Sequence, residues 1–261
     1  MPRVTRVAVV GAAGRMGQHV LRAVEAAPSL ELGAALDARG HPDLGKEVAP
    51  GIELVADIGK ALGGCHVAID FSTPAATLGL ITEATRLSVP LVIATTGFDD
   101  GGLADIENAA QRVPIVMAPN YSLGINVLVD LVAEAARRLE GYEIDILEMH
   151  HDQKTDAPSG TALRLGRTAA QARDLDFDAV AIYKRQGQTG PRPKDSIGMQ
   201  TLRLGDSVGE HTVYLAGAGE RLELSHRALS RENFAAGALR AAQWIIGKPA
   251  DLYSMQDVLK S

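Results

Sequence analysis

Short apolar segments alternate with helix-like segments through the first 120 residues, and this alternation constrains the fold more than any other feature. Helices are expected between the apolar segments at 15–26, 75–87 and 101–111. Short strands that are apolar throughout, each followed by a helix, are typical of a parallel sheet covered on both faces. The sequence therefore predicts an α/β fold with a Rossmann-type parallel sheet. The expected strands lie at 4–10, 32–36, 66–70, 91–94 and 114–118.

The pattern changes after Asn120. A long helix is expected at 123–139, and strand-like segments then follow one another with one helix among them, at about 161–172. Strands in series indicate a smaller α+β domain with a mainly antiparallel or mixed sheet. The Gly/Pro-rich residues 186–196 predict a long mobile loop, and a further helix is expected at 233–246. The strand-like segments lie at 143–149, 179–184, 197–204, 211–216 and 220–226.

Charge and cysteine content exclude several classes of protein. Lys and Arg total 26 against 32 Asp and Glu, a net charge of −6, whereas nucleic-acid binders normally show a basic excess. The single cysteine, Cys65, excludes an internal disulfide framework. An apolar run at 7–13 is too short and glycine-rich for a signal peptide, and no segment reaches the length of a membrane span. We therefore expect a cytoplasmic protein with no nucleic-acid or membrane partner.

A glycine-rich segment connects the first strand to the first helix. It reads Gly11-Ala12-Ala13-Gly14-Arg15-Met16-Gly17, a G-x-x-G-x-x-G spacing. Glycines let the backbone turn sharply and approach a ligand closely, and the N–H groups at a helix N-terminus bind phosphates. The segment predicts a dinucleotide-binding loop; the alternative is a tight turn that binds nothing.

Polar residues at later strand ends support a dinucleotide site. Asp37 ends the second strand, where a carboxylate can accept hydrogen bonds from a ribose diol and repel a 2′-phosphate. Arg39 lies two residues further on and could reach such a phosphate. We therefore expect NADH to be preferred, with NADPH also accepted; the alternative is that Asp37 is a turn residue or an edge-strand charge. Two further strand ends are expected to line the same crevice: Ala94-Thr95-Thr96-Gly97 and Ala118-Pro119-Asn120-Tyr121.

The densest polar cluster runs from Glu148 to Thr161, from the end of a strand into a helix. His150, His151 and Lys154 supply candidate general acids and bases. The segment Ser159-Gly160-Thr161 at a helix start offers N–H groups and a hydroxyl to a carboxylate. A metal site is not predicted, because adjacent histidines on a strand point to opposite faces and no further ligands complete the set. A solvated surface turn is the other alternative. His211 and His226 fall in strand patterns and are expected to be packed or hydrogen-bonded framework residues.

Taken together, these segments resemble the 4-hydroxy-tetrahydrodipicolinate reductases, also called dihydrodipicolinate reductases. The resemblance covers nearly the whole chain, and its most specific part is Glu148-Met149-His150-His151 with Lys154 and Asp156–Ala162. Its other parts are the glycine segment, Asp70-Phe71-Ser72-Thr73-Pro74, Thr95-Thr96-Gly97-Phe98, Gly209-Glu210-His211-Thr212 and Ser225-His226-Arg227.

The resemblance implies a dinucleotide-binding domain at 1–122, completed by 231–261, and a substrate-binding and oligomerisation domain at 123–230. It implies NAD(P)H-dependent reduction of a cyclic dicarboxylate in the diaminopimelate route to lysine, by a homotetramer. It also implies that His150 handles the proton with help from Lys154. Contacts with the substrate would come from His151, Lys154, Gly160 and Thr161, and the cofactor would lie against residues 11–16, Asp37, 94–97 and 118–121.

Two departures from the family pattern concern the cofactor. Many members carry Glu-Arg after the second strand, where this chain has Asp37-Ala38, which favours NADH. Ala94 replaces a glycine that relatives often have at that position. Two other functions fit the sequence less well. These are a dehydrogenase of another small carboxylate, such as aspartate or homoserine, and a non-catalytic nicotinamide-sensing module.

Overall fold

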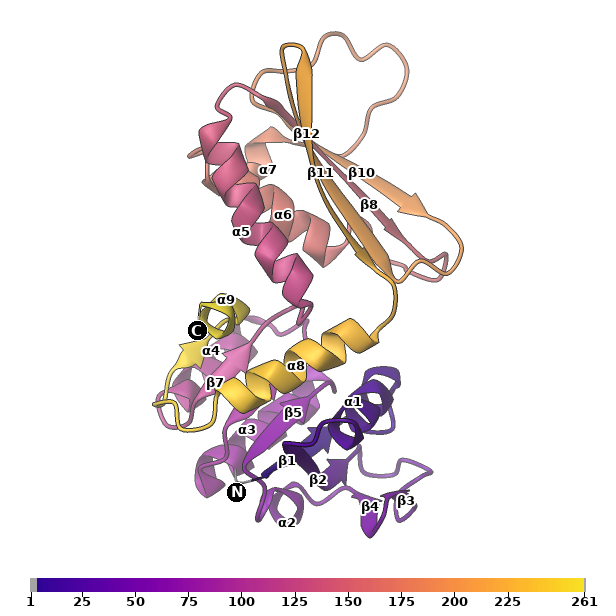
Figure 1. Ribbon diagram of the computed structural model, residues 1–261, viewed down its shortest axis with the longest axis vertical. Helices are drawn as coiled ribbons and strands as arrows, with labels where there is room; N and C mark the ends of the chain where they lie inside the picture. The colour runs from indigo at the N-terminus through magenta and orange to yellow at the C-terminus, as the bar shows by residue number, and fades with distance from the viewer. Residues whose placement is uncertain (1–3, 261) are drawn as a thin grey trace. The chain divides into compact units, whose positions relative to one another are not determined.

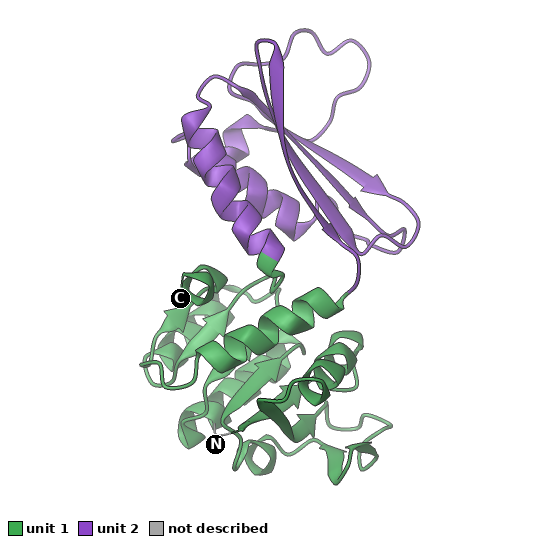
Figure 2. Ribbon diagram, in the orientation of Figure 1, with its two compact units in different colours: residues 1–123, 231–261 green, residues 124–230 purple. Residues whose placement is uncertain are grey.

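The computed structural model describes residues 4–260. The chain forms two compact units (Figure 2). Residues up to Leu123, with the segment from Arg231 onward, form the first unit. Residues Gly124–Ser230 form the second unit.

The first unit is built on an eight-stranded sheet (Figure 1). Its order is β13-β7-β6-β5-β1-β2-β4-β3, and the hydrogen-bonded pairs are parallel except for β3 with β4. The chain moves outward from β1 to β2 on one side and to β5 on the other, so the order reverses there. Ligands of open α/β sheets bind at the carboxyl ends of strands flanking such a reversal. The strands are β1 (Thr5–Val10), β2 (Leu30–Leu36), β3 (Glu47–Ala49), β4 (Ile52–Val55), β5 (Val67–Asp70), β6 (Leu91–Ile93), β7 (Ile115–Met117) and β13 (Leu252–Tyr253).

Helices cover both faces of this sheet, as the fully apolar strands require. Along β1, Val7 and Val9 pack on one face against α1, α8 and α9, whereas Ala8 and Val10 pack on the other against α2, α3 and α4. The apolar strand residues are therefore buried whichever face they point to. The helices are α1 (Arg15–Glu25), α2 (Ile58–Leu62), α3 (Pro74–Leu87), α4 (Asp100–Ala110), α8 (Glu232–Trp244) and α9 (Met255–Leu259).

The second unit is a five-stranded mixed sheet with helices on one face (Figure 1). Its order is β12-β11-β8-β10-β9; β8 pairs antiparallel with β11 and parallel with β10. Side chains alternate along each strand, so Ile144 and Ile146 of β8 point to the same face and form the core with α5 and α6. The elements are α5 (Leu123–Arg138), β8 (Glu143–His150), α6 (Gly160–Gln171), α7 (Phe177–Val180), β9 (Ala181–Ile182), β10 (Ile197–Arg203), β11 (Gly209–Gly217) and β12 (Glu220–Ala228).

The fold class predicted from the sequence is confirmed: a mainly parallel Rossmann-type sheet is followed by a mixed sheet. The prediction of a strand at 179–184 is wrong except at Ala181–Ile182. Asp176 caps the start of a helical turn at Phe177–Val180, and only Ala181–Ile182 remain extended. The sequence interpretation also missed the short elements β3, β4, α2, β13 and α9.

Residues 186–196 contain no helix or strand, as expected of a loop. Two arginines, one just before the loop and one within it, nevertheless anchor it to β8. Arg185 and Arg192 each bond the Asp145 carboxylate, and Arg192 also donates to the carbonyls of Ile144 and Ser196 at 2.6 Å. The sequence composition could not show this anchoring.

Candidate active site

Two of the glycines in the Gly11–Gly17 segment have no room for a side chain. Gly11 has φ +74°, and a Cβ on it would lie 2.4 Å from the Phe71 carbonyl oxygen at the end of β5. A Cβ on Gly17 would lie 2.1 Å from the Gly11 carbonyl oxygen, because the first turns of α1 pack directly on the loop. Helix α1 begins at Arg15, with Gly14 as its N-cap. The segment is thus a tight strand-to-helix turn whose helix N-terminus is available to an anion.

A cavity of about 570 Å³ adjoins this loop at the carboxyl ends of β1, β2 and β5. Gly11, Ala13, Gly14 and Asp37 line it, all of them predicted cofactor residues. The Asp37 carboxylate accepts hydrogen bonds from the N–H groups of Ala13 at 2.9 Å and Ala38 at 2.8 Å. These bonds fix the carboxylate at the cavity wall. The rest of the lining comprises Val10, Leu36, Ala38, Arg39, His41, Ala56, Ile58, Phe71, Ser72, Thr73, Ala75, Ala76 and Gly79.

The loops after β5 and β6 are tied together by a buried carboxylate that sequence reasoning did not single out. Asp70 is fully buried and accepts hydrogen bonds from the hydroxyls of Ser72, Thr77 and Thr95 and from the Ser72 N–H. Burial raises the Asp70 pKa, and these hydrogen bonds oppose the rise. The Thr95 side chain is therefore committed to holding the loop, which leaves the backbone of this segment to meet a ligand.

The remaining predicted cofactor residues differ in burial. Ala12 and Ala118 belong to the core, whereas Thr96 and Pro119 are exposed. The Tyr121 ring is buried, and its hydroxyl lies 2.9 Å from the Ile93 carbonyl and 3.0 Å from that of Val116. The Tyr121 hydroxyl is thus engaged by the framework.

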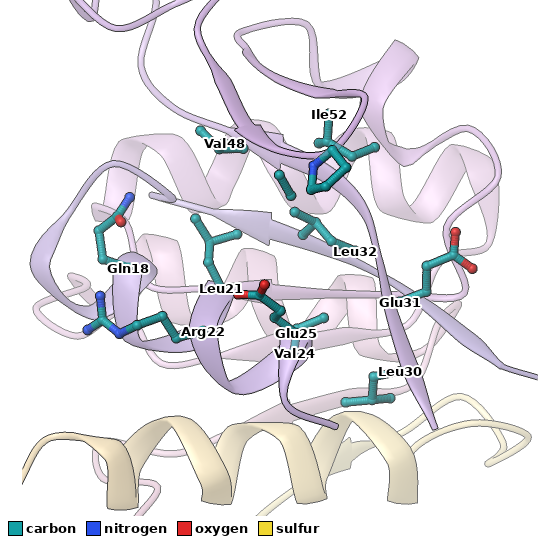
Figure 3. A pocket seen from close by; sticks show the side chains of 12 residues that line it. Gln18, Leu21, Arg22, Val24, Glu25, Leu30, Glu31, Leu32, Val48 and Ile52 are labelled. Carbon is teal, nitrogen blue, oxygen red and sulfur yellow. The ribbon is translucent and has the colours of Figure 1, made fainter. Parts of the chain in front are cut away.

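A second hollow of the first unit, about 460 Å³, lies between α1 and the strands β2, β3 and β4 (Figure 3). Apolar side chains such as Leu21, Leu32 and Ile52 line it together with the charged Arg22 and Glu25. None of the residues lining it was predicted as a site residue.

In the second unit, His150 ends β8 beside a buried carboxylate. The His150 Nδ1 atom lies 2.6 Å from Glu148 Oε2, two residues earlier on the same face of the strand. Glu148 is fully buried and also accepts hydrogen bonds from two Arg203 nitrogens, both at 2.9 Å, and from the Ser159 N–H at 3.0 Å. Burial alone would raise the Glu148 pKa, but the hydrogen bonds from His150, Arg203 and Ser159 outweigh it and lower the pKa to about 2.

The segment after β8 carries the predicted lysine and leads into α6. The Lys154 ammonium is bonded to both oxygens of Asp156, at 2.7 and 2.9 Å, and its side chain is 20% exposed. The Ala157–Pro158 peptide is cis. Ser159 then caps α6 by accepting from the Ala162 N–H at 3.1 Å. The helix N-terminus at Gly160 and Thr161 thus follows the lysine closely in the chain, as the predicted anion site requires.

His211 lies against His150, although it is 61 residues further along the chain. It is buried, as expected, and the two rings meet edge to face with centroids 5.2 Å apart. Its Nε2 lies 3.0 Å from the Ser159 hydroxyl. Burial and the nearby His150 lower the His211 pKa to about 3. At neutral pH, the His211 imidazole is therefore uncharged where it packs against His150.

The structure brings His150, Lys154 and the start of α6 into one region of the second unit. Sequence reasoning missed Glu148 and Arg203 as parts of this site, although Glu148 was noted within the polar cluster. Arg203 comes from β10, and only the pairing of Arg203 with His150 in the sheet register reveals it. Within residues 4–260, no group of three or more His, Cys, Asp or Glu side chains is arranged to hold a metal ion. None of the helices in the same range has the length and apolar character needed to cross a membrane.

A Rossmann-type unit with a glycine loop, joined to a second unit that carries a histidine–lysine site, defines the class of two-domain oxidoreductases. The comparisons identify the family within that class. Residues 5–121 match the family described as "Dihydrodipicolinate reductase, N-terminus" and residues 124–259 match "Dihydrodipicolinate reductase, C-terminus". The chain belongs to the dihydrodipicolinate reductase family, whose members act in lysine and diaminopimelate biosynthesis and use a nicotinamide cofactor.

Relatives of similar length agree with this family. A protein of Anaeromyxobacter dehalogenans (strain 2CP-1), named 4-hydroxy-tetrahydrodipicolinate reductase, is 48% identical over 98% of this chain and 97% of its own. One of Thiobacillus denitrificans with the same name is 48% identical over 97% and 98% of the two chains. A solved structure, the dipicolinate-bound dihydrodipicolinate reductase from Paenisporosarcina sp. TG-14, is 25% identical and has a TM-score of 0.79. It covers 96% of this chain and 97% of its own. These matches favour the reductase over the aspartate or homoserine dehydrogenases that the sequence also allowed.

Proposed function

We propose that the chain catalyses the reduction of 4-hydroxy-tetrahydrodipicolinate to tetrahydrodipicolinate, with His150 as the proton donor and Lys154 assisting. The observation that carries this proposal is the buried Glu148 carboxylate bonded to His150 Nδ1. An ionised carboxylate only accepts hydrogen bonds, so the proton between the two groups belongs to His150. In the imidazolium form, Nε2 then carries the second proton and can deliver it.

The first unit fits a nicotinamide dinucleotide, which supplies the hydride when it is bound. The fit rests on the close approach of Gly11 to the Phe71 carbonyl, which a side chain would prevent, and on the cavity beside the loop. Residues 11–16 would hold the pyrophosphate at the start of α1, and Asp37 would accept from the adenosine ribose. Residues 94–97 and 118–121, at the ends of β6 and β7, would line the nicotinamide side.

NADH is the preferred cofactor in this proposal. The Asp37 carboxylate is fixed at the cavity wall and repels a 2′-phosphate, while Ala38 offers no cation beside it. Arg39 and His41 line the same cavity and leave a route to weaker NADPH binding. The Asp37 carboxylate is the charge that we place at the ribose, and this sets the preference for NADH.

Lys154 and the N-terminus of α6 would bind the carboxylates of the substrate. A lysine ammonium has three N–H donors, and Asp156 engages it on one side only. His151, Gly160 and Thr161 would complete the anion site by family likeness. Dipicolinate, which the Paenisporosarcina relative binds, is a dicarboxylate of this kind.

The assembly proposed is a homotetramer in the cytoplasm. Leu202, which is 45% exposed, pairs in register with Met149 on the sheet face of the second unit that points away from α5 and α6. Pairing of two such faces from two copies would bury these apolar side chains. The number of subunits, four, is proposed from the resemblance to the family. The cytoplasmic location is proposed from the sequence features alone.

A coupled assay tests the function directly. The upstream synthase generates the substrate, and the oxidation of NADH and of NADPH is followed separately by absorbance. We expect substrate-dependent oxidation of both, with a higher kcat/KM for NADH. Oxidation that does not depend on the synthase product would contradict the proposed reaction, and a higher kcat/KM for NADPH would contradict only the preference.

A further inference from the structure

All the acceptor positions of Glu148 are used inside the protein. Its Oε1 accepts from the Ser159 N–H and from one terminal nitrogen of Arg203, and its Oε2 accepts from His150 and from the other terminal nitrogen. A carboxylate has about four lone-pair sites, so none is left for a substrate. Glu148 therefore acts on any reaction at this site only through its neighbours.

Arg203 connects this carboxylate to the segment that carries Lys154. Besides its two bonds to Glu148, its Nε donates to the Lys154 carbonyl at 3.3 Å and one terminal nitrogen donates to the Asp156 carbonyl at 2.6 Å. The side chain is 19% exposed, so these bonds lie largely out of water. One guanidinium thus fixes the position of Glu148 and of the backbone on both sides of residue 155.

The free side of the His150 ring is kept open by the neighbouring strand. A Cβ on Gly209, at the start of β11, would lie 2.9 Å from His150 Nε2. The glycine leaves that nitrogen uncovered, while Nδ1 on the other side of the ring is held by Glu148. The His150 side chain is 12% exposed, with Nδ1 fixed by Glu148 and no side chain at position 209 to obstruct Nε2.

We propose that Glu148 and Arg203 form a buried positioning pair for the reaction. Glu148 holds the His150 proton on Nδ1 and stabilises the imidazolium, and Arg203 keeps the carboxylate in place while it orders the segment that carries Lys154. This inference rests on the proposed role of His150.

The charged groups around His150 determine how each substitution changes the pH dependence. Glu148 bonds the ring from β8 and His211 contacts it from β11, whereas Arg203 of β10 bonds Glu148, and Lys154 with Asp156 lies in the segment that follows. Glu148→Gln removes the negative charge that both His150 and the Arg203 cation bond, and therefore disfavours the imidazolium. Arg203→Met leaves the carboxylate without its cation and favours the imidazolium. The two variants should therefore move the loss of activity at alkaline pH in opposite directions, which a purely structural role would not do.

The experiment measures kcat and substrate KM between pH 5.5 and 9.5 for full-length variants in the coupled assay, with cofactor Kd measured separately. For Glu148→Gln we expect kcat to fall about 10²-fold at pH 7.5 and the loss of activity at alkaline pH to begin at lower pH, with an unchanged NADH Kd. For Arg203→Met we expect the loss of activity at alkaline pH to begin at higher pH. Arg203→Lys should raise the substrate KM at least about fivefold, because a lysine cannot bond the carboxylate and both carbonyls.

The matched control is Arg173→Lys. Arg173 also holds backbone carbonyls, those of Ala136, Leu139 and Tyr142, at 2.7–3.0 Å, but lies in the loop after α6. We expect Arg173→Lys to leave the pH profile and the substrate KM unchanged.

The variant His150→Gln distinguishes a failure of the Glu148–Arg203 positioning pair from a failure of the proposed role of His150. Wild-type kcat and pH profile in Glu148→Gln, with activity lost in His150→Gln, would overturn the positioning pair alone. Wild-type kcat in His150→Gln would instead remove the proposed function of His150. If Glu148→Gln does not fold, Arg203→Lys decides, and an unchanged substrate KM in that variant would overturn the inference.

Discussion

His211 links the chemistry of the site to the stability of the second unit. Its side chain is 3% exposed, and its pKa is lowered to about 3 by burial and by the nearby His150. When pH falls below about 6.5, the unfolded chain binds a proton at this histidine and the folded chain does not. The stability that neutral His211 contributes is therefore complete above pH 6.5 and is lost as pH falls towards 3.

Replacement of His211 should flatten the acid dependence of stability. Between pH 6 and pH 4.5 one such histidine contributes a slope of about 1.4 kcal/mol per pH unit. We expect His211→Asn to reduce the slope of the unfolding free energy against pH by up to that amount in urea titrations. Gln171→Asn, at an exposed position in α6 and without a titratable group, is the control and should leave the slope unchanged. An equal slope in wild type and His211→Asn would contradict the buried, neutral state of His211.

Glu148 adds to the same acid sensitivity at lower pH. Its pKa is lowered to about 2, so the unfolded chain binds a proton first as pH falls below about 4.5. The stabilisation that ionised Glu148 contributes is present above pH 4.5 and is lost towards pH 2. As pH falls, the second unit therefore loses stability first through His211 and then through Glu148.

Replacement of Lys154 tests substrate binding separately from cofactor binding. Its ammonium is bonded to Asp156 and lies on the segment ordered by Arg203. We expect Lys154→Ala to lower kcat at least about 10²-fold and to weaken inhibition by dipicolinate, with little change in NADH Kd. Lys184→Ala, at an exposed position, is the control. Near-normal turnover in Lys154→Ala would exclude Lys154 from the mechanism.

The packing of α1 on the glycine loop makes Gly17 essential to the first unit. A Cβ there would lie 2.1 Å from the Gly11 carbonyl and 2.6 Å from the Ala12 Cα, both backbone atoms. We expect Gly17→Ala to destabilise the protein by about 1–3 kcal/mol and to weaken NADH binding, as measured by urea unfolding and by titration of cofactor fluorescence. Gly101→Ala, early in α4, is the control, since its Cβ would meet only ordinary contacts. Unchanged NADH affinity in Gly17→Ala would argue against this loop as the cofactor site.

The elements that sequence patterns predicted well are those whose signal is local. The predicted first-unit strands are mainly apolar and alternate with segments of helical periodicity, so their type and order followed from the sequence pattern. The hairpin of β3 and β4 was missed because it is short and carries Glu47 and Glu53 at exposed positions. Periodicity also failed at 179–184, where the Asp176 cap decides the local structure.

The candidate site was only partly predictable for a related reason. His150, Lys154 and the start of α6 lie within a dozen residues, so their chemistry could be seen in the sequence. Arg203 and His211 meet them only through strand register, which places Arg203 beside His150 and His211 beside Glu148. Register is set by the packing of whole faces, and residue patterns alone do not fix it.

At the scale of the whole molecule, the average charge conceals the site. The chain carries −6 overall, although both ligands proposed for it are anions. Between His150 and Lys194 there are eight Lys and Arg against five Asp and Glu, a local balance of +3. Net acidity therefore describes the exterior on average and does not exclude an anion site.

The proposed tetramer predicts a measurable mass. In light scattering coupled to size exclusion, we expect a particle of about four times the 27.5 kDa chain. Leu202→Glu should reduce that mass, because it places a charge in the apolar face proposed to pair between copies. Leu131→Glu, at a 50% exposed position on α5, is the control. A monomeric wild type, or an unchanged mass in Leu202→Glu, would contradict the proposed pairing.

The role of His150 is the central claim, and one measurement tests it most directly. The steady-state kcat of His150→Gln is compared with that of the wild type in the synthase-coupled assay with NADH. Glutamine can still bond Glu148 but cannot deliver a proton, so we predict a kcat at least about 10²-fold lower with NADH Kd unchanged. A kcat within about twofold of the wild type would contradict the account, because the proton would then have to come from another group.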